Sequence, residues 1–289
     1  MASLSELRKQ IKGIKSTSKI TRAMKMVASA RFSRAQAAMV GSRRFYDEVF
    51  STFSQLVVSA DKSPRTVRYI SFDNKPSPRK KIGLIIVTGD KGLCGDFNSS
   101  IIRDAERMLK NPENNIASVF TLGRKACDYF RKNPDYKIIE YPNIFNNLEI
   151  AFAERLGAEI LKKFDEEKLT SVIVISARFK SMIKKEIETT TLLPVYIDKS
   201  TKPSGCLYEP MDEDELMAST IPFVVKSLIY KLLRESYVAE LAQRMRAMDN
   251  ATTNAGTLIE KITLEMNKVR QGNITRELTE IIGTNEVIK

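Results

Sequence analysis

Histidine is absent from this chain of 289 residues. Imidazole is the commonest general base and a common metal ligand in proteins, so neither kind of site can be built here in its usual form. An enzymatic role is therefore less favoured, although chemistry based on carboxylates or lysines stays open.

Cysteine is scarce, and its distribution argues against two further kinds of site. Cys94, Cys127 and Cys206 are odd in number, lie far apart and form no C-x-x-C motif. This pattern argues against a disulfide framework and against a metal site, and it favours a reducing compartment. No motif in the chain implies a cofactor, so we expect none.

Long apolar runs are also missing. No window approaches 18 consecutive apolar residues, so the sequence predicts no membrane-spanning helix. The first residues are polar and basic throughout, unlike the apolar centre of a signal peptide. We therefore expect neither a secretory signal nor a transmembrane anchor.

Proline is missing from both ends of the chain, because all ten prolines fall between Pro64 and Pro222. The two ends are thus free of the residue that breaks helices. Each end carries apolar or small residues at alternating spacings of three and four, the pattern of a coiled-coil seam. In the first helix, in which Ser3 and Glu6 form a capping box, the seam residues are Leu4, Leu7, Ile11, Ile14, Ser18, Thr21, Lys25, Ala28, Phe32, Ala35 and Met39. In the last helix they are Val238, Leu241, Met245, Met248, Thr252, Ala255, Ile259, Ile262, Met266 and Val269.

A helix with such a stripe needs a partner of similar length, since helices in water gain most of their stability from packing. The chain offers only one candidate for each end, namely the other end. We predict that the two helices pair antiparallel as a coiled coil, with Lys25 as the one violation of the seam. The sequence leaves open whether Pro222 kinks the last helix or lies in its first turn.

The middle of the chain alternates between strand and helix patterns. The predicted strands are 82–88, 117–122, 136–139, 171–176 and 186–193; the predicted helices are 98–110, capped by Asn98 or Ser99, 124–132 and 148–164. This order predicts an α/β fold with a Rossmann-like open, mainly parallel sheet. The expected domains are an N-terminal helix at 1–60, a linker at 61–80, a central α/β domain at 81–210 and a C-terminal helix at 211–289.

Positive charge is concentrated at the start of the chain. Residues 1–45 contain eleven lysines and arginines against the single acid Glu6, within a net charge of +12 for the whole chain. Such a helix suggests an acidic partner, which could be nucleic acid, anionic lipid or an acidic protein surface. A merely solvated face is an equally good interpretation of the charge alone.

A glycine-rich loop follows the first predicted strand, at residues 89–98. Strand, glycine loop and helix is the geometry that holds phosphate in dinucleotide folds. The spacing here is G-x-x-G-x-x-G, which matches neither the dinucleotide fingerprint nor the P-loop, and Asp90 and Asp96 would repel a phosphate. The sequence therefore favours a tight structural turn or a protein-contact loop over a nucleotide site.

Several motifs together resemble the gamma subunit family of F-type ATP synthases. They are I-K-S-T-S-K-I-T-R-A-M-K-M-V-A-S at 14–29, the G-D-K-G-L-C-G loop, L-L-P at 192–194, L-Y-E-P at 207–210, R-M-R-A-M-D-N-A-T-T-N-A at 244–255 and N-K-V-R-Q-G-N-I-T-R-E-L-T-E-I-I at 267–282. The resemblance covers the chain from end to end.

The resemblance implies a rotor shaft that has no catalytic site, cofactor or metal of its own. The shaft would stand in a ring of three alpha and three beta subunits, and the α/β domain would be its foot on the membrane c-ring, beside epsilon. Rotation would couple hydrogen ion transport to ATP synthesis. The residues expected to face the ring are Arg22, Met24, Lys25, Arg244, Arg270, Gln271, Thr275 and Glu277; those of the foot are Cys94, Tyr208 and Glu209.

By this resemblance the chain would be a peripheral protein on the cytoplasmic face of a bacterial plasma membrane, touching the membrane only through the c-ring; the matrix side of a mitochondrial membrane is the less favoured alternative. Two other interpretations stay open. One is a basic coiled coil that binds nucleic acid, although base-reading side chains and stacking aromatics are sparse in the first helix. The other is an α/β nucleotide-binding enzyme, which would need the phosphate fingerprint that the loop lacks.

Overall fold

The computed structural model describes residues 3–59, 68–72, 81–132, 136–146, 148–182, 185–198, 200–201 and 213–287. The chain divides into two compact units, which we describe separately. The helical unit contains Met1–Ser29 and Arg244–Lys289, and the α/β unit contains Ala30–Gln243. Tyr208, Glu209, Cys206 and most of the predicted linker at 61–80 lie outside the described residues.

Two long helices supply residues to both units: α1 spans Leu4–Ser59 and α5 spans Glu213–Val287. The predicted capping box begins α1, because the Glu6 amide donates to Ser3 Oγ at 3.2 Å and the Ser3 amide donates to Glu6 Oε2 at 2.9 Å. Pro222 lies inside α5 rather than in its first turn, so the helix begins well before the proline-free stretch.

A five-stranded sheet forms the centre of the α/β unit, in the order β4-β3-β2-β5-β6. Strands β2 (Ile82–Val87), β3 (Ile116–Leu122), β4 (Ile138–Tyr141) and β5 (Ser171–Phe179) are parallel, and β6 (Lys185–Leu193) runs antiparallel to β5. The predicted α/β fold with a mainly parallel sheet is confirmed. Two short strands, β1 (Ile70–Ser71) and β7 (Val195–Tyr196), form a separate parallel pair that the sequence did not reveal.

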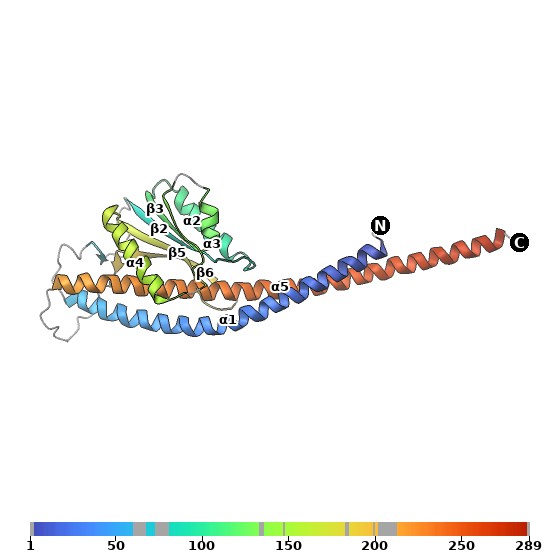
Figure 1. Cartoon of the computed structure of the whole chain (residues 1–289), viewed down its shortest axis with the longest axis horizontal. Coiled ribbons are helices and arrows are strands. Elements are labelled where there is room, and N and C mark those ends of the chain that lie inside the picture. The colour runs from blue at the N-terminus through green and yellow to red at the C-terminus, as the bar shows by residue number, and fades with distance from the viewer. Residues whose placement is uncertain are drawn as a thin grey trace. The chain divides into compact units, whose positions relative to one another are not determined.

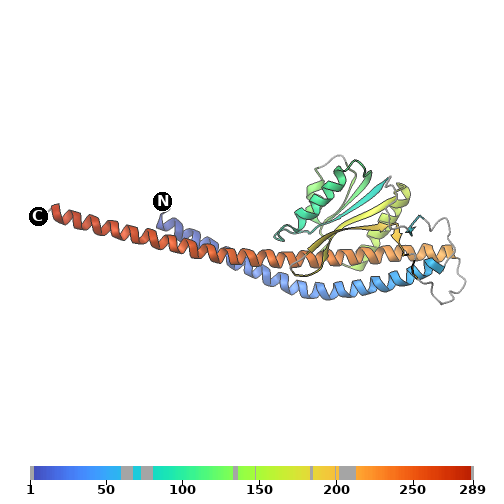
Figure 2. The same cartoon turned by 180° about the vertical axis from the view of Figure 1, so that it is seen from behind.

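Helices cover both faces of this sheet (Figures 1 and 2). On one face, α2 (Phe97–Lys110) and α3 (Arg124–Phe130) pack on Leu84 and Ile86 of β2. On the other face, α4 (Ile150–Glu166) and the first part of α5 pack on Ile85 and Val87 of the same strand. Since β2 is buried on both sides, its uninterrupted apolar sequence is the one expected of a central parallel strand.

Two local predictions were wrong. The helix at 97–110 begins at Phe97 with Asp96 at the N-cap position, so neither Asn98 nor Ser99 caps it. Asn98 instead accepts a hydrogen bond from the Gly89 amide, 2.8 Å from its Oδ1, which draws its side chain toward the loop. The fourth strand covers 138–141 rather than 136–139, because its register is set by pairing of Ile138 with Val119 in β3.

Candidate functional site

The seam of the helical unit is narrow and partly polar. Thr21 Oγ1 on α1 and Thr252 Oγ1 on α5 share a hydrogen bond of 2.7 Å, and Ala28 and Ala255 are buried. Small side chains let the two helices approach closely at these positions. The predicted stripe is thus the least exposed face of both helices, and its small residues are part of its packing.

Lys25, the predicted violation of the seam, has a partner on the other helix. Its Nζ donates to Asp249 Oδ1 at 2.6 Å, and both side chains keep about half of their surface in solvent, at 42% and 56% exposure. An ion pair this exposed contributes only ~0–1 kcal/mol to stability. The ion pair of Lys25 therefore adds little to the stability of the chain, and the charge of Lys25 stays accessible to solvent.

Contacts within each unit show that α1 and α5 run antiparallel. In the helical unit, Thr21 meets Thr252 while Lys25 meets Asp249. In the α/β unit, Arg43 Nη2 lies 2.7 Å from Glu235 Oε1, and Lys231 lies near Asp47. Residue numbers fall on α5 as they rise on α1 in both units, as the sequence predicts.

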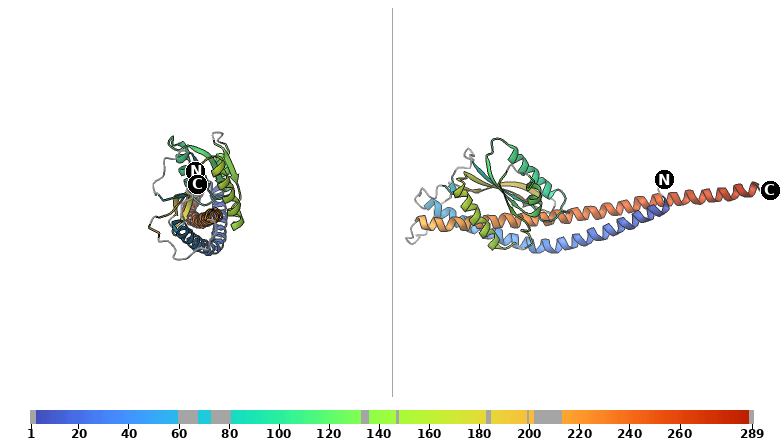
Figure 3. Two further views of the ribbon diagram at one scale, coloured as in Figure 1. Left: turned by 90° about the vertical axis from the view of Figure 1, so that its left-hand side faces the viewer. Right: turned by 45° about the horizontal axis from the view of Figure 1, so that its top comes forward.

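The C-terminal part of α5 extends past its partner within the helical unit. Counting back from the Thr21–Thr252 contact, the first helical residue of α1, Leu4, lies level with Val269. Every residue from 270 to 279 is exposed, whereas Val269 is still half-buried. Figures 1 and 3 show this end of α5 continuing as a single helix beyond the N-terminus.

All eight residues expected to face a ring lie in the helical unit. Five are exposed: Arg22, Arg270, Gln271, Thr275 and Glu277. The other three, Met24, Lys25 and Arg244, are half-buried. The last four of the eight residues occupy the unpaired part of α5, where no side chain of α1 can cover them.

Exposed apolar side chains in the same unit were missed by the sequence analysis. On α1 they are Ile20, Met26 and Val27, and on α5 they are Leu258, Leu264, Ile274 and Leu278; Leu264 is the most exposed at 64%. None of them occupies a predicted seam position. A search of the sequence for apolar residues outside the seam could therefore have found them. Such side chains mixed with exposed cations are typical of a surface that another protein covers.

Asp90 organises the glycine loop in the α/β unit. Its buried carboxylate accepts three backbone amides: Arg124 at 3.0 Å and Asn143 at 2.8 Å on Oδ1, and Phe145 at 3.0 Å on Oδ2. The amide of Arg124 is the first of α3, so the carboxylate occupies the position that a phosphate would take at a helix N-terminus. This geometry favours the structural-turn interpretation of the loop.

The rest of the loop is held by internal contacts. Lys185 Nζ donates to Asp96 Oδ1 at 2.8 Å, and this hydrogen bond holds the pKa of the Asp96 carboxyl below its ordinary value. The thiol of Cys94, expected to belong to the foot, is only 2% exposed and accepts from Asn98 Nδ2 at 3.1 Å. Its neighbour Leu93 is 57% exposed, so Leu93 is a large apolar side chain that this loop presents to solvent.

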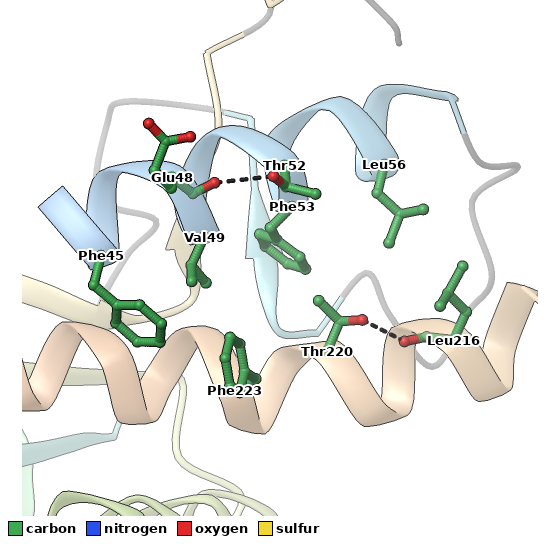
Figure 4. A pocket seen from close by; sticks show the side chains of 9 residues that line it. All are labelled: Phe45, Glu48, Val49, Thr52, Phe53, Leu56, Leu216, Thr220 and Phe223. Atoms are coloured by element: carbon green, nitrogen blue, oxygen red, sulfur yellow. Dashed lines mark hydrogen bonds between the residues drawn. The ribbon is translucent and has the colours of Figure 1, made fainter. Parts of the chain in front are cut away.

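One cavity of about 400 Å³ lies between α1 and α5 in the α/β unit (Figure 4). Its lining is mostly apolar, with three phenylalanines, of which Phe45 and Phe223 meet edge to face at 5.8 Å. Both lining hydroxyls, of Thr52 and Thr220, donate to carbonyls of their own helices. Among the described residues that line it, Glu48 is the only ionisable one, and a single carboxylate supplies no acid–base pair.

Comparison with known proteins identifies the family. A family model described as ATP synthase matches residues 3–288. The ATP synthase gamma chain of Halothermothrix orenii is 35% identical, and that of Geotalea daltonii is 36% identical; each alignment covers the whole of both proteins. The chain belongs to the ATP synthase gamma chain family.

Solved structures related to this gamma-type chain share its fold. The rotor of the Euglena gracilis mitochondrial ATP synthase matches with a TM-score of 0.66 at 17% identity, over 94% of this chain and 98% of that one. The central stalk and c-ring structure from Tetrahymena thermophila matches with a TM-score of 0.62 at 24% identity, over 80% and 99%. Among the described residues, no helix of this gamma-type chain is both long and apolar enough to cross a membrane.

Proposed function

We propose that this chain is the central rotor shaft of a proton-translocating ATP synthase, with its helical unit inside the catalytic ring. The observation that carries the proposal is the full-length match to gamma chains, joined with the exposed surface of the helical unit. Rotation of an asymmetric helix pair would change which catalytic subunit is open. The nucleotide sites would then belong to the neighbours.

The ring contacts follow from exposure and charge. Arg22, Met24 and Lys25 on α1, with Arg244 on α5, would meet loops of three alpha and three beta subunits. The unpaired stretch containing Arg270, Gln271, Thr275 and Glu277 would reach furthest, because α1 covers none of it. Exposed Ile274 and Leu278 would contact an apolar collar there. Acidic loops in the ring would complement the seven basic residues and one acid of residues 1–29.

The α/β unit would be the foot on the c-ring and would also bind the epsilon subunit. Its proposed contacts are Tyr208, Glu209 and the loop at Cys94, with exposed Leu93 as the side chain that touches a partner. We place the complex on the cytoplasmic face of a bacterial plasma membrane, where this chain would be peripheral. It would have no catalytic site of its own. This view is supported by Asp90, whose carboxylate accepts the three backbone amides that could otherwise bind a phosphate.

Co-expression with alpha and beta subunits tests the shaft proposal. We expect the chain to co-elute with them in one hexamer-sized complex, and reversal of Lys15, Lys19 and Arg22 to glutamate to lower the recovered complex at least tenfold. A matched control reverses three exposed cations of the α/β unit, Arg103, Lys125 and Lys132, and should assemble normally. Equal loss in both triple variants would mean that net charge, and not the shaft surface, governs assembly.

The nucleic-acid alternative predicts a different result from the same proteins. If the basic helix bound nucleic acid, the isolated chain would shift a duplex or single strand at physiological salt, and the Lys15, Lys19 and Arg22 variant would not. We expect no salt-resistant binding, because the α1 surface offers no aromatic side chain within residues 1–29 on which a base could stack.

A further inference from the structure

The carboxyl ends of β2, β3 and β4 meet at one edge of the sheet in the α/β unit. In open α/β sheets, ligands bind in the crevice outside this edge, where neighbouring connections run to opposite faces. Strand β2 lies between β3 and β5, so its carboxyl end at Val87 marks that point. The loop that begins at Thr88 and Gly89 is therefore where a ligand would be expected.

Helix α5 occupies the crevice beyond the carboxyl end of β2. The Tyr237 ring stacks on Phe145 with ring centroids 5.0 Å apart, and the Phe145 amide is one of the three held by Asp90. Ala239 and Glu240 are 1% and 3% exposed, and Glu240 lies against Gly89. Val238 and Leu241 are buried on another side of the helix, where they pack with Ala35 and Met39 of α1. Ala239 also joins the core on the face covered by α2 and α3.

Glu240 fits against Gly89 with no room to spare. A Cβ atom built on Gly89 would lie 2.6 Å from Glu240 Oε1, 3.1 Å from its Cδ and 3.2 Å from its Cγ. The backbone of Gly89 does not adopt a left-handed conformation, so a larger residue is disfavoured here by the space that the Glu240 side chain takes.

A carboxylate is an unexpected side chain for a position that only has to pack. A buried carboxylate needs a partner to offset its removal from water, and an apolar residue of similar size would fill the space without one. Buried polar groups can instead select one arrangement of the packed elements over its alternatives. In that role, Glu240 against Gly89 would fix both the rotation and the axial position of α5 relative to the sheet.

We propose that the ligand crevice of this sheet holds the chain's own shaft helix, with Glu240 as the positioning residue and Gly89 as its notch. This joint would prevent the α/β unit from slipping around α5 when torque passes from the foot to the shaft. The inference rests on the proposed rotor function for its purpose, but the joint itself can be tested without it.

Hydrogen exchange on the isolated full-length chain tests the joint. Gly89→Ala adds a methyl group where Glu240 lies, so the amides of 143–145 and 236–241 should exchange at least tenfold faster. Gly92→Ala is the matched control, because nothing lies within 4 Å of a Cβ at that glycine and its backbone is not left-handed. Equal protection in the two variants would overturn the joint. If Gly89→Ala does not accumulate, Glu240→Ala should loosen the 143–145 turn to a similar degree, and unchanged protection would contradict us.

Membrane vesicles that contain the assembled enzyme test the purpose of the joint. With Gly89→Ala, ATP-driven proton pumping per ATP hydrolysed should fall at least threefold, and with Gly92→Ala it should stay unchanged. Glu240→Ala alone should lower this ratio to a similar degree, because it removes the side chain that Gly89 accommodates. Faster exchange with normal pumping would show that the joint exists but carries no torque. Failure of the chain to assemble in its native sequence would instead count against the rotor function.

Discussion

Gly123 shows at the scale of one residue how tightly the loops of the α/β unit are built. Its φ is +91°, and a Cβ there would lie 2.1 Å from the carbonyl oxygen of Thr88. Thr88 also accepts the Ala126 amide on its Oγ1 at 2.8 Å, and its own amide donates to the Leu122 carbonyl. The end of β2 thus holds the start of α3 through contacts that a larger residue at 123 would break.

Replacing Gly123 by alanine should therefore destabilise the chain. Backbone strain together with the clash at Thr88 predicts a loss of about 2–4 kcal/mol in the free energy of unfolding, measured in urea. Gly41→Ala is the contrasting control, since Gly41 lies in α1 with open space around its Cα. The control should stabilise the chain by about 0.5–1 kcal/mol through helix propensity. Equal effects of the two changes would refute this account of the turn.

The hydrogen bond between Lys185 and Asp96 predicts a dependence of stability on pH. Because Lys185 lowers the pKa of the Asp96 carboxyl, the folded state holds this group ionised more strongly than the unfolded chain does. Its contribution is complete above the ordinary value of 3.8 and is lost as pH falls through the lower folded-state pKa. In Asp96→Asn, the fall in unfolding free energy between pH 5 and pH 2 should be shallower. An unchanged pH profile would show that the pair is not formed in solution.

The two long helices are the elements whose pairing matters most for the proposed function. Their antiparallel register rests on contacts made inside each unit, and it was predictable because the chain offers each helix only one partner. A disulfide scan can read this register directly. Thr21→Cys with Thr252→Cys places the two thiols where hydroxyls now lie 2.7 Å apart, so oxidation should cross-link them within minutes.

The off-register control pairs Thr17→Cys with the same Thr252→Cys. Thr17 is exposed, lies one turn from Thr21 and is not one of the seam positions. Both double variants carry Cys206→Ser, while Cys94 and Cys127 are buried. Mobility on a non-reducing gel distinguishes the linked chain from the free one. Equal linkage in both pairs, or none in the pair at 21 and 252, would contradict the register.

Sequence patterns predicted elements better than they predicted contacts. The continuous apolar run of β2 and the seam positions of α1 and α5 follow from periodicity, because burial imposes a period on the chain. Three features had no such signal. Lys25 pairs with Asp249, which is distant in sequence. Asn98, expected to cap a helix, accepts a hydrogen bond from the Gly89 amide instead. Asp90, expected to repel a phosphate, occupies the position that a phosphate would take. Each depends on tertiary contacts that a local pattern does not encode.

At the scale of the whole molecule, the chain is a gamma-type subunit that has one continuous helix, α5, in both of its units. Two features bear on how such a subunit would work as a rotor: the contact of Glu240 with Gly89 in the α/β unit, and the exposed, unpaired end of α5 in the helical unit. The first would hold the shaft, and the second would meet the catalytic ring. In the proposed function, the shaft must turn relative to that ring.

Locking the shaft is the most direct test. We would place a cysteine at the exposed Gln271 and another in the facing loop of a catalytic subunit, then oxidise the assembled complex. The account predicts that steady-state ATP hydrolysis stops when cross-linking is complete, that nucleotide still binds the neighbouring subunits, and that reduction restores turnover. Gln271→Cys without the second cysteine should hydrolyse ATP normally under both conditions. Full hydrolysis by a quantitatively cross-linked complex would show that α5 does not rotate, and the rotor account would fail.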